Sequence, residues 1–337
     1  MKRKLLIGAL LVIVAVAGGL VFYFLKKPTE KFPPRDLQKV TLKLKWLHQA
    51  QFAGNYVAKE KGFYAEEGLD VKLEPFSFEN PTIDAVANGK ADFGITGADE
   101  LVLARAKGVP IKAFAVVYKI NPVCAYSLKK SGIKTPKDFV GKTVGIERAA
   151  DGTEINVGIL YKAMMTKMGI DRSKIKEVTI GYDAKELLSG ITDVSTGYII
   201  NEPQQVIAAG QEVNTILMAD YGLNMYADVL FTTEEKIKNN PELVDSFLRA
   251  TLKGWRYALE HVDEAVDETL KYATDRTKTH ETYMLSQSVP LIYAGEYQIG
   301  KMKEEEWEKV KEILQEQKIL DKEINIQDVY TNEFFER

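Results

Sequence analysis

The stretch TLKLKWLHQAQFAGNYVAKEKGFYAEEGLDVKL, Thr41–Leu73, decides the fold. Its opening residues alternate apolar and charged side chains as far as Trp46, which predicts a half-buried strand. Apolar residues then recur at helical spacing until Gly62, a residue type that commonly ends a helix. Gly68 turns the chain into a second apolar strand. A strand, a helix and a strand in this order predict a βαβ unit with parallel strands.

The carboxyl end of these two strands is expected to face a ligand, because open α/β sheets bind ligands outside that edge. Polar turn residues and the start of the helix directly follow the aromatic residue at the strand end. The residues predicted to contact a ligand here are therefore Trp46, Gln49, Gln51 and Phe52. The pattern leaves one alternative open, in which Trp46 is an ordinary core aromatic.

Composition narrows the class of protein. The chain has 337 residues, of which 45% are hydrophobic, so it is globular and long enough for roughly two domains. Its net charge of −3 gives no reason to expect nucleic-acid binding. A single cysteine, Cys124, excludes an intrachain disulfide framework and a cysteine-built metal site.

The amino-terminal segment predicts export. Leu5–Leu25 is apolar, uncharged and flanked by basic residues, and its 21 residues are enough to cross a bilayer. We expect residues 1–27 to form an uncleaved membrane helix and the proline-containing residues 28–37 to form a tether. Ala15–Ala17 resembles a cleavage site, so a secreted or periplasmic protein with a cleaved signal is the alternative. No cysteine follows the apolar run, which excludes a lipoprotein anchor of the lipobox type.

The remaining chain alternates strands and helices in two series. In the first, the strand Ala91–Thr96 runs into a turn and a helix, which places Thr96 and Asp99 at the expected ligand edge. The alternative to ligand contact is a structural role, in which Asp99 caps its own helix. Tyr118 follows the next strand, Ile111–Val117, although a hinge position for it is equally consistent with the pattern.

Two lobes with the chain crossing between them follow from this order of elements. We expect residues 38–125 and 226–337 to form lobe one and residues 126–225 to form lobe two. A cleft between two such lobes, closing by a hinge around a small ligand, is their expected mechanics.

Several segments resemble one known family. The segments are KWLHQAQFAGNYVAKEKGFYAEEGLDVKL, ANGKADFGITGADELVLARAKGVPIKAFAVVY, TPKDFVGKTVGI and GYIINEP. They are similar to the thiamine-precursor-binding branch of the periplasmic solute-binding proteins of ABC importers, over Val40–Arg337. The resemblance implies a type II periplasmic-binding-protein fold, α/β with an interlobe cleft, behind the amino-terminal membrane helix. It also implies an extracytoplasmic location and two partners, an ABC permease and its ATPase.

The resemblance also implies a ligand, a small nitrogen heterocycle of the aminopyrimidine type. Trp46 matches the family's strand-end aromatic residue, which would stack on a planar ring. Glu202, in GYIINEP, would accept two hydrogen bonds from the ring edge, although a first-turn glutamate that stabilises a helix is its alternative role. Tyr198 and Asn201 flank Glu202 and are predicted to complete the wall.

The loop after the strand Lys142–Ile146 argues against an anionic ligand. It carries Glu147, Asp151 and Glu154, and like charges near a bound anion are unfavourable. Arg148 is expected to pair with one of these three acids at the surface. Sulfonate or taurine, nitrate and riboflavin-like compounds nevertheless remain alternative ligands.

An enzyme is the weaker hypothesis. The same fold includes the yeast-type synthase of the thiamine pyrimidine, and VYTNEFF near the carboxyl terminus is similar to that enzyme's ending. The family's enzyme is marked by a cysteine-rich run and a histidine near Phe52, yet Tyr221–Tyr226 has no cysteine and His48 lies upstream. We therefore expect no catalytic residue, no metal ion and no cofactor. A signalling input module acting through another chain is a further alternative.

Overall fold

A computed structural model describes residues 36–148, 156–296 and 298–336. Gln38–Arg337 forms one compact unit. Within the described ranges no helix is both long and apolar enough to span a bilayer. The membrane helix predicted for residues 1–27, and the tether as far as residue 35, lie outside them.

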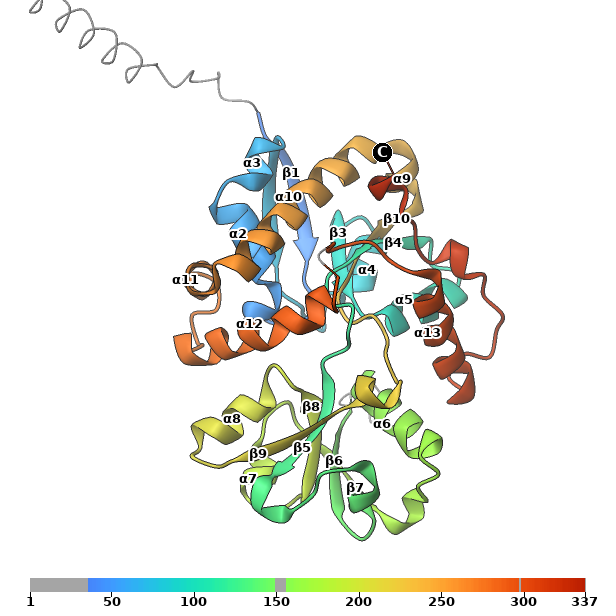
Figure 1. The fold of residues 1–337 in the computed structure, drawn as a ribbon. Helices are drawn as coiled ribbons and strands as arrows, with labels where there is room; N and C mark the ends of the chain where they lie inside the picture. Colours follow the sequence, from blue (N-terminus) through green and yellow to red (C-terminus); the bar gives the residue numbers. More distant parts are fainter. Residues whose placement is uncertain (1–35, 149–155, 297, 337) are drawn as a thin grey trace, which may run out of the picture. The chain divides into compact units, whose positions relative to one another are not determined.

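The first of two sheets has five strands in the order β2-β1-β3-β10-β4 (Figure 1). Strand β1 pairs in parallel with β2 and β3, whereas β10 runs antiparallel to β3 and β4 and comes from far along the chain. The strands are β1 (Gln38–Lys43), β2 (Leu69–Glu74), β3 (Phe93–Thr96), β4 (Ile111–Val116) and β10 (Val229–Thr233). The predicted βαβ unit is confirmed, with Val40 opposite Val71.

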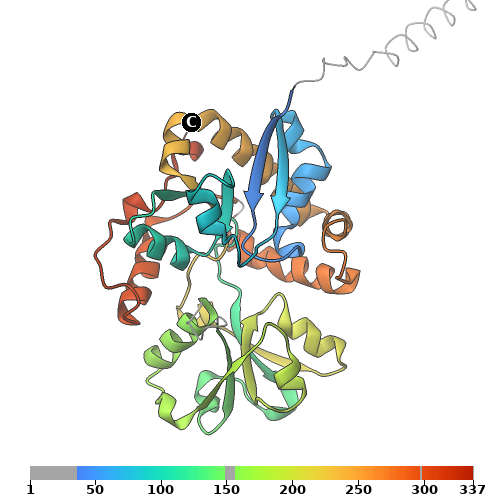
Figure 2. The same ribbon diagram turned by 180° about the vertical axis from the view of Figure 1, so that it is seen from behind.

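Helices from both parts of the chain surround this sheet, some packed on it and others, such as α11 and α13, packed on neighbouring helices (Figures 1 and 2). They are α2 (Ala53–Glu60), α3 (Phe63–Glu66), α4 (Thr82–Ala87), α5 (Ala98–Ala106), α9 (Glu234–Asn239), α10 (Pro241–Glu260), α11 (Val262–Leu270), α12 (Lys278–Tyr293) and α13 (Glu304–Glu316). A short 3-10 turn, η1 (Ala50–Phe52), leads into α2. The last third of the sequence predicts four helices, which correspond to α10–α13: Glu242–Glu260, Asp263–Tyr272, His280–Tyr293 and Glu304–Gln317.

Glycine allows α2 and α10 to pack closely. A Cβ atom on Gly254 would lie 2.7 Å from the Cβ of Ala58, and one on Gly54 would meet the ring of Trp255. Because neither glycine has a side chain, the buried indole of Trp255 reaches the backbone of α2. The contact fixes α2, and with it the turn that follows β1.

The second sheet also has five strands, in the order β7-β6-β8-β5-β9. They are β5 (Val123–Leu128), β6 (Thr143–Glu147), β7 (Lys176–Ile180), β8 (Val194–Tyr198) and β9 (Val213–Leu217). Strand β6 is parallel to β7 and β8. The helices between the strands of this sheet are α6 (Asn156–Lys167), α7 (Lys185–Leu188) and α8 (Glu202–Ala208). The predicted two-lobed α/β fold is confirmed by these two sheets, although β9 was not predicted.

Two segments connect the sheets, between β4 and β5 and between β9 and β10. Asn121, in the first segment, donates its side-chain amide to Met225 O at 3.0 Å, and its backbone N–H donates to Asn224 Oδ1 at 2.9 Å. The two crossing segments are therefore hydrogen-bonded to each other.

Two details of the predicted strands are wrong. The first strand ends at Lys43, three residues before Trp46, and Lys43 is 1% exposed instead of facing solvent. Strand β1 lies inside the sheet, where Lys43 pairs with Glu74 at 3.0 Å. The apolar run Gly197–Ile200 predicts a strand, but strand β8 ends at Tyr198, and Ile200 packs into a hydrophobic core.

Candidate functional site

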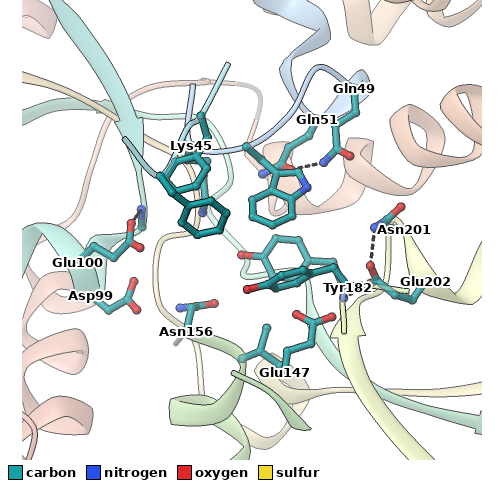
Figure 3. Close-up of a pocket in the computed structure, with 16 residues that line it drawn as sticks. Lys45, Gln49, Gln51, Asp99, Glu100, Glu147, Asn156, Tyr182, Asn201 and Glu202 are labelled. Carbon is teal, nitrogen blue, oxygen red and sulfur yellow. Dashed lines mark hydrogen bonds between the residues drawn. The ribbon is translucent and has the colours of Figure 1, made fainter. Parts of the chain in front are cut away.

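A cavity of about 290 Å³ lies between the two sheets. Its walls come from the carboxyl ends of parallel strands in both sheets, β1, β2 and β3 in the first and β6, β7 and β8 in the second. Figure 3 shows the lining residues. They are Lys45, Trp46, Gln49, Gln51, Phe76, Phe78, Gly97, Asp99, Glu100, Glu147, Asn156, Val157, Tyr182, Tyr198, Asn201 and Glu202.

Seven of the ten predicted ligand-contacting residues line this cavity: Trp46, Gln49, Gln51, Asp99, Tyr198, Asn201 and Glu202. The other three lie outside the lining. Phe52 packs into the core beneath the first sheet. Tyr118 is fully buried and its hydroxyl donates to Ser288 Oγ at 2.8 Å. Thr96 is buried and its hydroxyl donates to the carboxylate of Glu100, so its polar group is already satisfied.

Aromatic side chains form one wall of the cavity. The rings of Trp46 and Tyr182 meet edge to face with centroids 4.9 Å apart, and they come from different sheets. Phe76 stacks on the other side of Trp46 at 6.2 Å and touches Phe78 at 5.1 Å. Phe78 is 74% exposed, which places it at the mouth. Such a wall suits the face of a planar ring.

Glu202 lies at one end of the cavity and is 3% exposed. Its carboxylate accepts from the backbone N–H of Tyr198 at 2.7 Å and from the side-chain amide of Asn201. A Cβ atom on Gly197 would lie 2.6 Å from Glu202 Oε2, so only glycine leaves room for this arrangement. Burial raises the pKa of Glu202 to about 7, although the hydrogen bonds oppose the rise.

The same glutamate also occupies the first turn of α8, next to Pro203. Helix N-termini favour acidic side chains, so the helix-stabilising role weighed for Glu202 is compatible with its position in the cavity.

Glu147 is a second buried carboxyl near Glu202. It ends β6, is 6% exposed, and lines the cavity below the aromatic rings (Figure 3). Burial first, and the negative charge of Glu202 second, raise the pKa of Glu147 well above its ordinary value. Two carboxyls that repel each other in this way favour a proton or a hydrogen-bond donor between them.

Lys45 is the cation among the described residues that line the cavity. Its ammonium donates to Ala227 O at 2.9 Å and lies 3.3 Å from Asp228 Oδ1. Gln51 Nε2 donates to both oxygens of Asp228 at 3.0 Å, and Gln49 donates in turn to Gln51 Oε1 at 2.7 Å. Burial alone would lower the pKa of Lys45, but Tyr198, Asp228 and the nearby acids hold it above its ordinary value.

The end of the cavity opposite Glu202 is built by α5 and α6 (Figure 3). Asp99 is 1% exposed, and burial together with the neighbouring charge of Glu100 raises its pKa to about 6. Asn156 approaches Asp99 closely enough to oppose that rise. Within the described ranges, however, Asp99 Oδ1 and both polar atoms of the Asn156 amide have no hydrogen-bond partner of acceptable geometry.

Sequence reasoning missed several of these residues. The sequence did not identify Lys45 as a site residue, because its position in an alternating strand predicted that its charge faces solvent. Tyr182 follows β7, so the strand-end rule that found Trp46 would have found it. Asn156 carries no comparable signal. Among the described residues Arg148 pairs with Glu177 at 3.6 Å, an acid outside the expected set of Glu147, Asp151 and Glu154. Asp151 and Glu154 themselves lie outside the described residues.

Other polar groups do not build a metal site. No cluster of three or more histidine, cysteine, aspartate or glutamate side chains suited to a metal ion occurs in the described part of the chain. His48 lies outside the cavity lining and its Nδ1 is 3.0 Å from the hydroxyl of Tyr56.

Two α/β sheets joined by two crossings, with a cavity at their strand ends, form a two-lobed fold like that of periplasmic binding proteins. The aliphatic sulphonate binding protein SsuA from Escherichia coli superposes with a TM-score of 0.67, at 14% identity, over 86% of this chain and 91% of its own. This likeness shows the fold.

The chain belongs to the NMT1/THI5 like family, whose model matches residues 49–265. The family resemblance stated above is thereby confirmed. Riboflavin-binding protein RibY of Chloroflexus aurantiacus is 29% identical over 88% of this chain and 86% of its own length. Formylaminopyrimidine-binding protein of Halalkalibacterium halodurans is 30% identical over 69% and 70%. A 4-amino-5-hydroxymethyl-2-methylpyrimidine phosphate synthase of Legionella pneumophila is 28% identical over 88% and 92%.

Proposed function

We propose that this protein is the solute-binding component of an ABC importer and captures a small nitrogen heterocycle, with an aminopyrimidine precursor of thiamine as the first candidate. The observation that carries the proposal is the aromatic wall of Trp46 and Tyr182 beside the buried carboxyls of Glu202 and Glu147. A ring stacked on the wall would present its edge to these carboxyls.

The chemistry of that edge supports an aminopyrimidine. Its exocyclic amine and a protonated ring nitrogen are adjacent donors, and a carboxylate accepts two such bonds side by side. The raised pKa of Glu202 means that a ligand supplying this positive charge or these donors would stabilise its ionised form. The formylaminopyrimidine-binding relative is named for a ligand of this class.

Anionic ligands fit this cavity poorly. The described residues of its lining include four carboxyl groups, from Asp99, Glu100, Glu147 and Glu202, and the lysine among them already pairs with Asp228. A sulfonate or nitrate would face like charges without a free cation to balance them among the described lining residues.

A flavin is the second candidate. Polar groups occur at two separated ends of the cavity with aromatic rings between them, an arrangement that also suits a larger ring bearing a polar chain (Figure 3). A relative named as a riboflavin-binding protein supports flavins as this second candidate class of ligand.

We also propose that the protein binds its ligand without catalysing a reaction. A nucleophilic lysine must give up its proton, yet Lys45 is ion-paired and its pKa lies above the ordinary value. Capture would instead work by closure of the lobes over the ligand, which removes it from water, and release would deliver it to the permease and its ATPase. This role requires an extracytoplasmic location.

A thermal-shift panel tests the proposal. The purified full-length protein is mixed separately with aminopyrimidines, thiamine, riboflavin, taurine, nitrate and pyridoxal phosphate. A ligand that binds only the native state raises the melting temperature by mass action. We expect a shift with an aminopyrimidine or with riboflavin. A shift with taurine or nitrate alone would contradict the ligand class, and one with pyridoxal phosphate alone would favour an enzyme.

A further inference from the structure

We propose that Asp99 and Asn156 form a second subsite that binds a hydroxyl-bearing arm of the ligand. The inference rests on the proposed function, since it assumes that the ring of the ligand lies against Trp46 and Glu202. It adds a specificity requirement, because a bare ring would leave this end of the cavity without contacts.

The position of the two residues is the first step. Figure 3 shows Asp99 and Asn156 toward one end of the cavity and Asn201 and Glu202 at the other, with aromatic rings between them. Asp99 belongs to α5 and Asn156 to α6, so the two residues face the cavity from different lobes. An arm bound between them would touch both lobes at once.

Unmet hydrogen bonding is the second step. Asp99 is 1% exposed, and its Oδ1 has no partner in the described part of the chain. The same holds for Asn156 Oδ1 and Nδ2. Buried polar atoms are hydrogen-bonded in the great majority of cases, and orphaned ones cost free energy. Asn156 lies close enough to Asp99 to lower its pKa, yet the geometry between them satisfies neither side chain. Together they offer two acceptor oxygens and one donor nitrogen to a bound group.

The neighbouring charges in the lining do not supply these bonds. The carboxylate of Glu100 accepts from the hydroxyl of Thr96 and from Gly97 N at 3.3 Å. The ammonium of Lys45 is held by Ala227 O and Asp228. Both groups act on Asp99 electrostatically, Glu100 raising its pKa and Lys45 lowering it.

The type of ligand group follows from this inventory. A hydroxyl group both donates and accepts, so it can donate to Asp99 and accept from Asn156 Nδ2. An ammonium group only donates and would leave Asn156 Nδ2 unpaired. A phosphate only accepts and would meet the carboxyls of Asp99 and Glu100. One hydroxyl, or two adjacent ones, therefore satisfies the subsite best.

Matched pairs of ligands test the subsite by isothermal titration calorimetry. One pair is riboflavin and lumiflavin, which share a ring system but differ in the hydroxylated chain. The other is 4-amino-5-hydroxymethyl-2-methylpyrimidine and 4-amino-2,5-dimethylpyrimidine, which differ in one hydroxyl. The variants are Asp99→Ala and Asn156→Ala, with Asp84→Ala on the exposed surface of α4 as the matched control. Each melting temperature is measured without ligand to confirm folding.

We expect the wild-type protein to prefer the hydroxylated member of one pair by about tenfold or more, as the loss of one or two hydrogen bonds predicts. Each cavity variant should reduce that preference to less than about threefold, whereas the control should retain it. The pair that shows the preference identifies whether the arm is a long chain or a single hydroxymethyl group.

Two other results would contradict the subsite, and they can be told apart. Equal affinity of the wild-type protein for both members of each pair, or equal weakening of both by the variants, would overturn the subsite and leave the proposed function standing. Failure of the folded wild-type protein to bind any of the four compounds would overturn the proposed function, and the subsite with it.

Discussion

Asp228 and Glu202 are both buried carboxyls beside the same cavity, yet their surroundings differ. Asp228 is 1% exposed, faces the ammonium of Lys45 and accepts two hydrogen bonds from Gln51. Glu202 is 3% exposed, accepts from a backbone N–H and an amide, and has Glu147 as a charged neighbour.

The difference separates a structural role from a binding role. Burial raises the pKa of all three carboxyls, but Asp228 has a cation at 3.3 Å that opposes the rise. Among the described residues, neither Glu202 nor Glu147 forms such an ion pair. Lys45 and Asp228 join the turn after β1 to the segment before β10, so they hold the site together. Glu202 and Glu147 are the groups that a donor-rich ligand would stabilise.

The largest expected effect comes from breaking the structural pair. Lys45→Met leaves Asp228 buried without its cation, so we expect a loss of about 3 kcal/mol in the free energy of unfolding. Urea denaturation at pH 7 measures it. The double variant Lys45→Met/Asp228→Asn should recover most of the loss, because no uncompensated charge remains. A loss below about 1 kcal/mol in the single variant would refute the structural role of Lys45.

Glu202→Gln tests the other carboxyl. The change replaces one acceptor oxygen with a donor at the edge of the bound ring, so affinity for the heterocycle should fall about 10- to 100-fold. Calorimetry measures the affinity, and the free energy of unfolding at pH 8 should not decrease. Glu212→Gln, at an exposed glutamate, is the matched control. An unchanged dissociation constant would exclude Glu202 as a ligand-binding residue.

Trp46→Ala is expected to cost about tenfold in affinity, through lost stacking and apolar contact with the ring. Trp46 is only partly buried: it contacts the rings of Phe76 and Tyr182 and packs at the edge of the core of the first sheet. Stability should therefore change less than affinity does. Thermal melts and calorimetry on the same sample compare the two. A large fall in melting temperature with affinity retained would make Trp46 a core residue.

The smallest predicted effect is on the pH dependence of stability. The pKa of Glu202 rises from 4.5 to about 7 on folding, so the folded state binds more protons between these values and stability falls as pH rises. Between pH 6 and pH 7 the fall due to Glu202 is about 1 kcal/mol. Glu202→Gln should flatten this part of the profile. Identical profiles for the two proteins would show that Glu202 titrates normally.

Much of the fold was predictable from the sequence because it depends on local patterns. Strand and helix periodicity located both sheets, and the rule that ligands bind at strand ends led to Trp46, Asp99 and Glu202. The pattern misplaced Phe52 and Tyr118, because residues at a strand end or a helix start can turn inward to the core. It also missed Lys45, because its buried partner Asp228 lies more than 180 residues along the chain.

The remaining part of the site depends on contacts between lobes, which no local pattern contains. The contact between Trp46 and Tyr182, and the approach of Asn156 to Asp99, both require the two sheets to be placed together. His280 Nε2 likewise lies 2.9 Å from Asn201 Oδ1, linking α12 to the residue before α8. Such pairs are set by tertiary packing, so only the folded chain reveals them.

The most direct test of the central claim is a crystal structure of the protein with the heterocycle that binds most tightly. The account predicts the ring stacked on Trp46, with its donors within about 3 Å of the carboxyl oxygens of Glu202. A ring bound elsewhere, or one in the cavity with its donors turned away from Glu202, would contradict it.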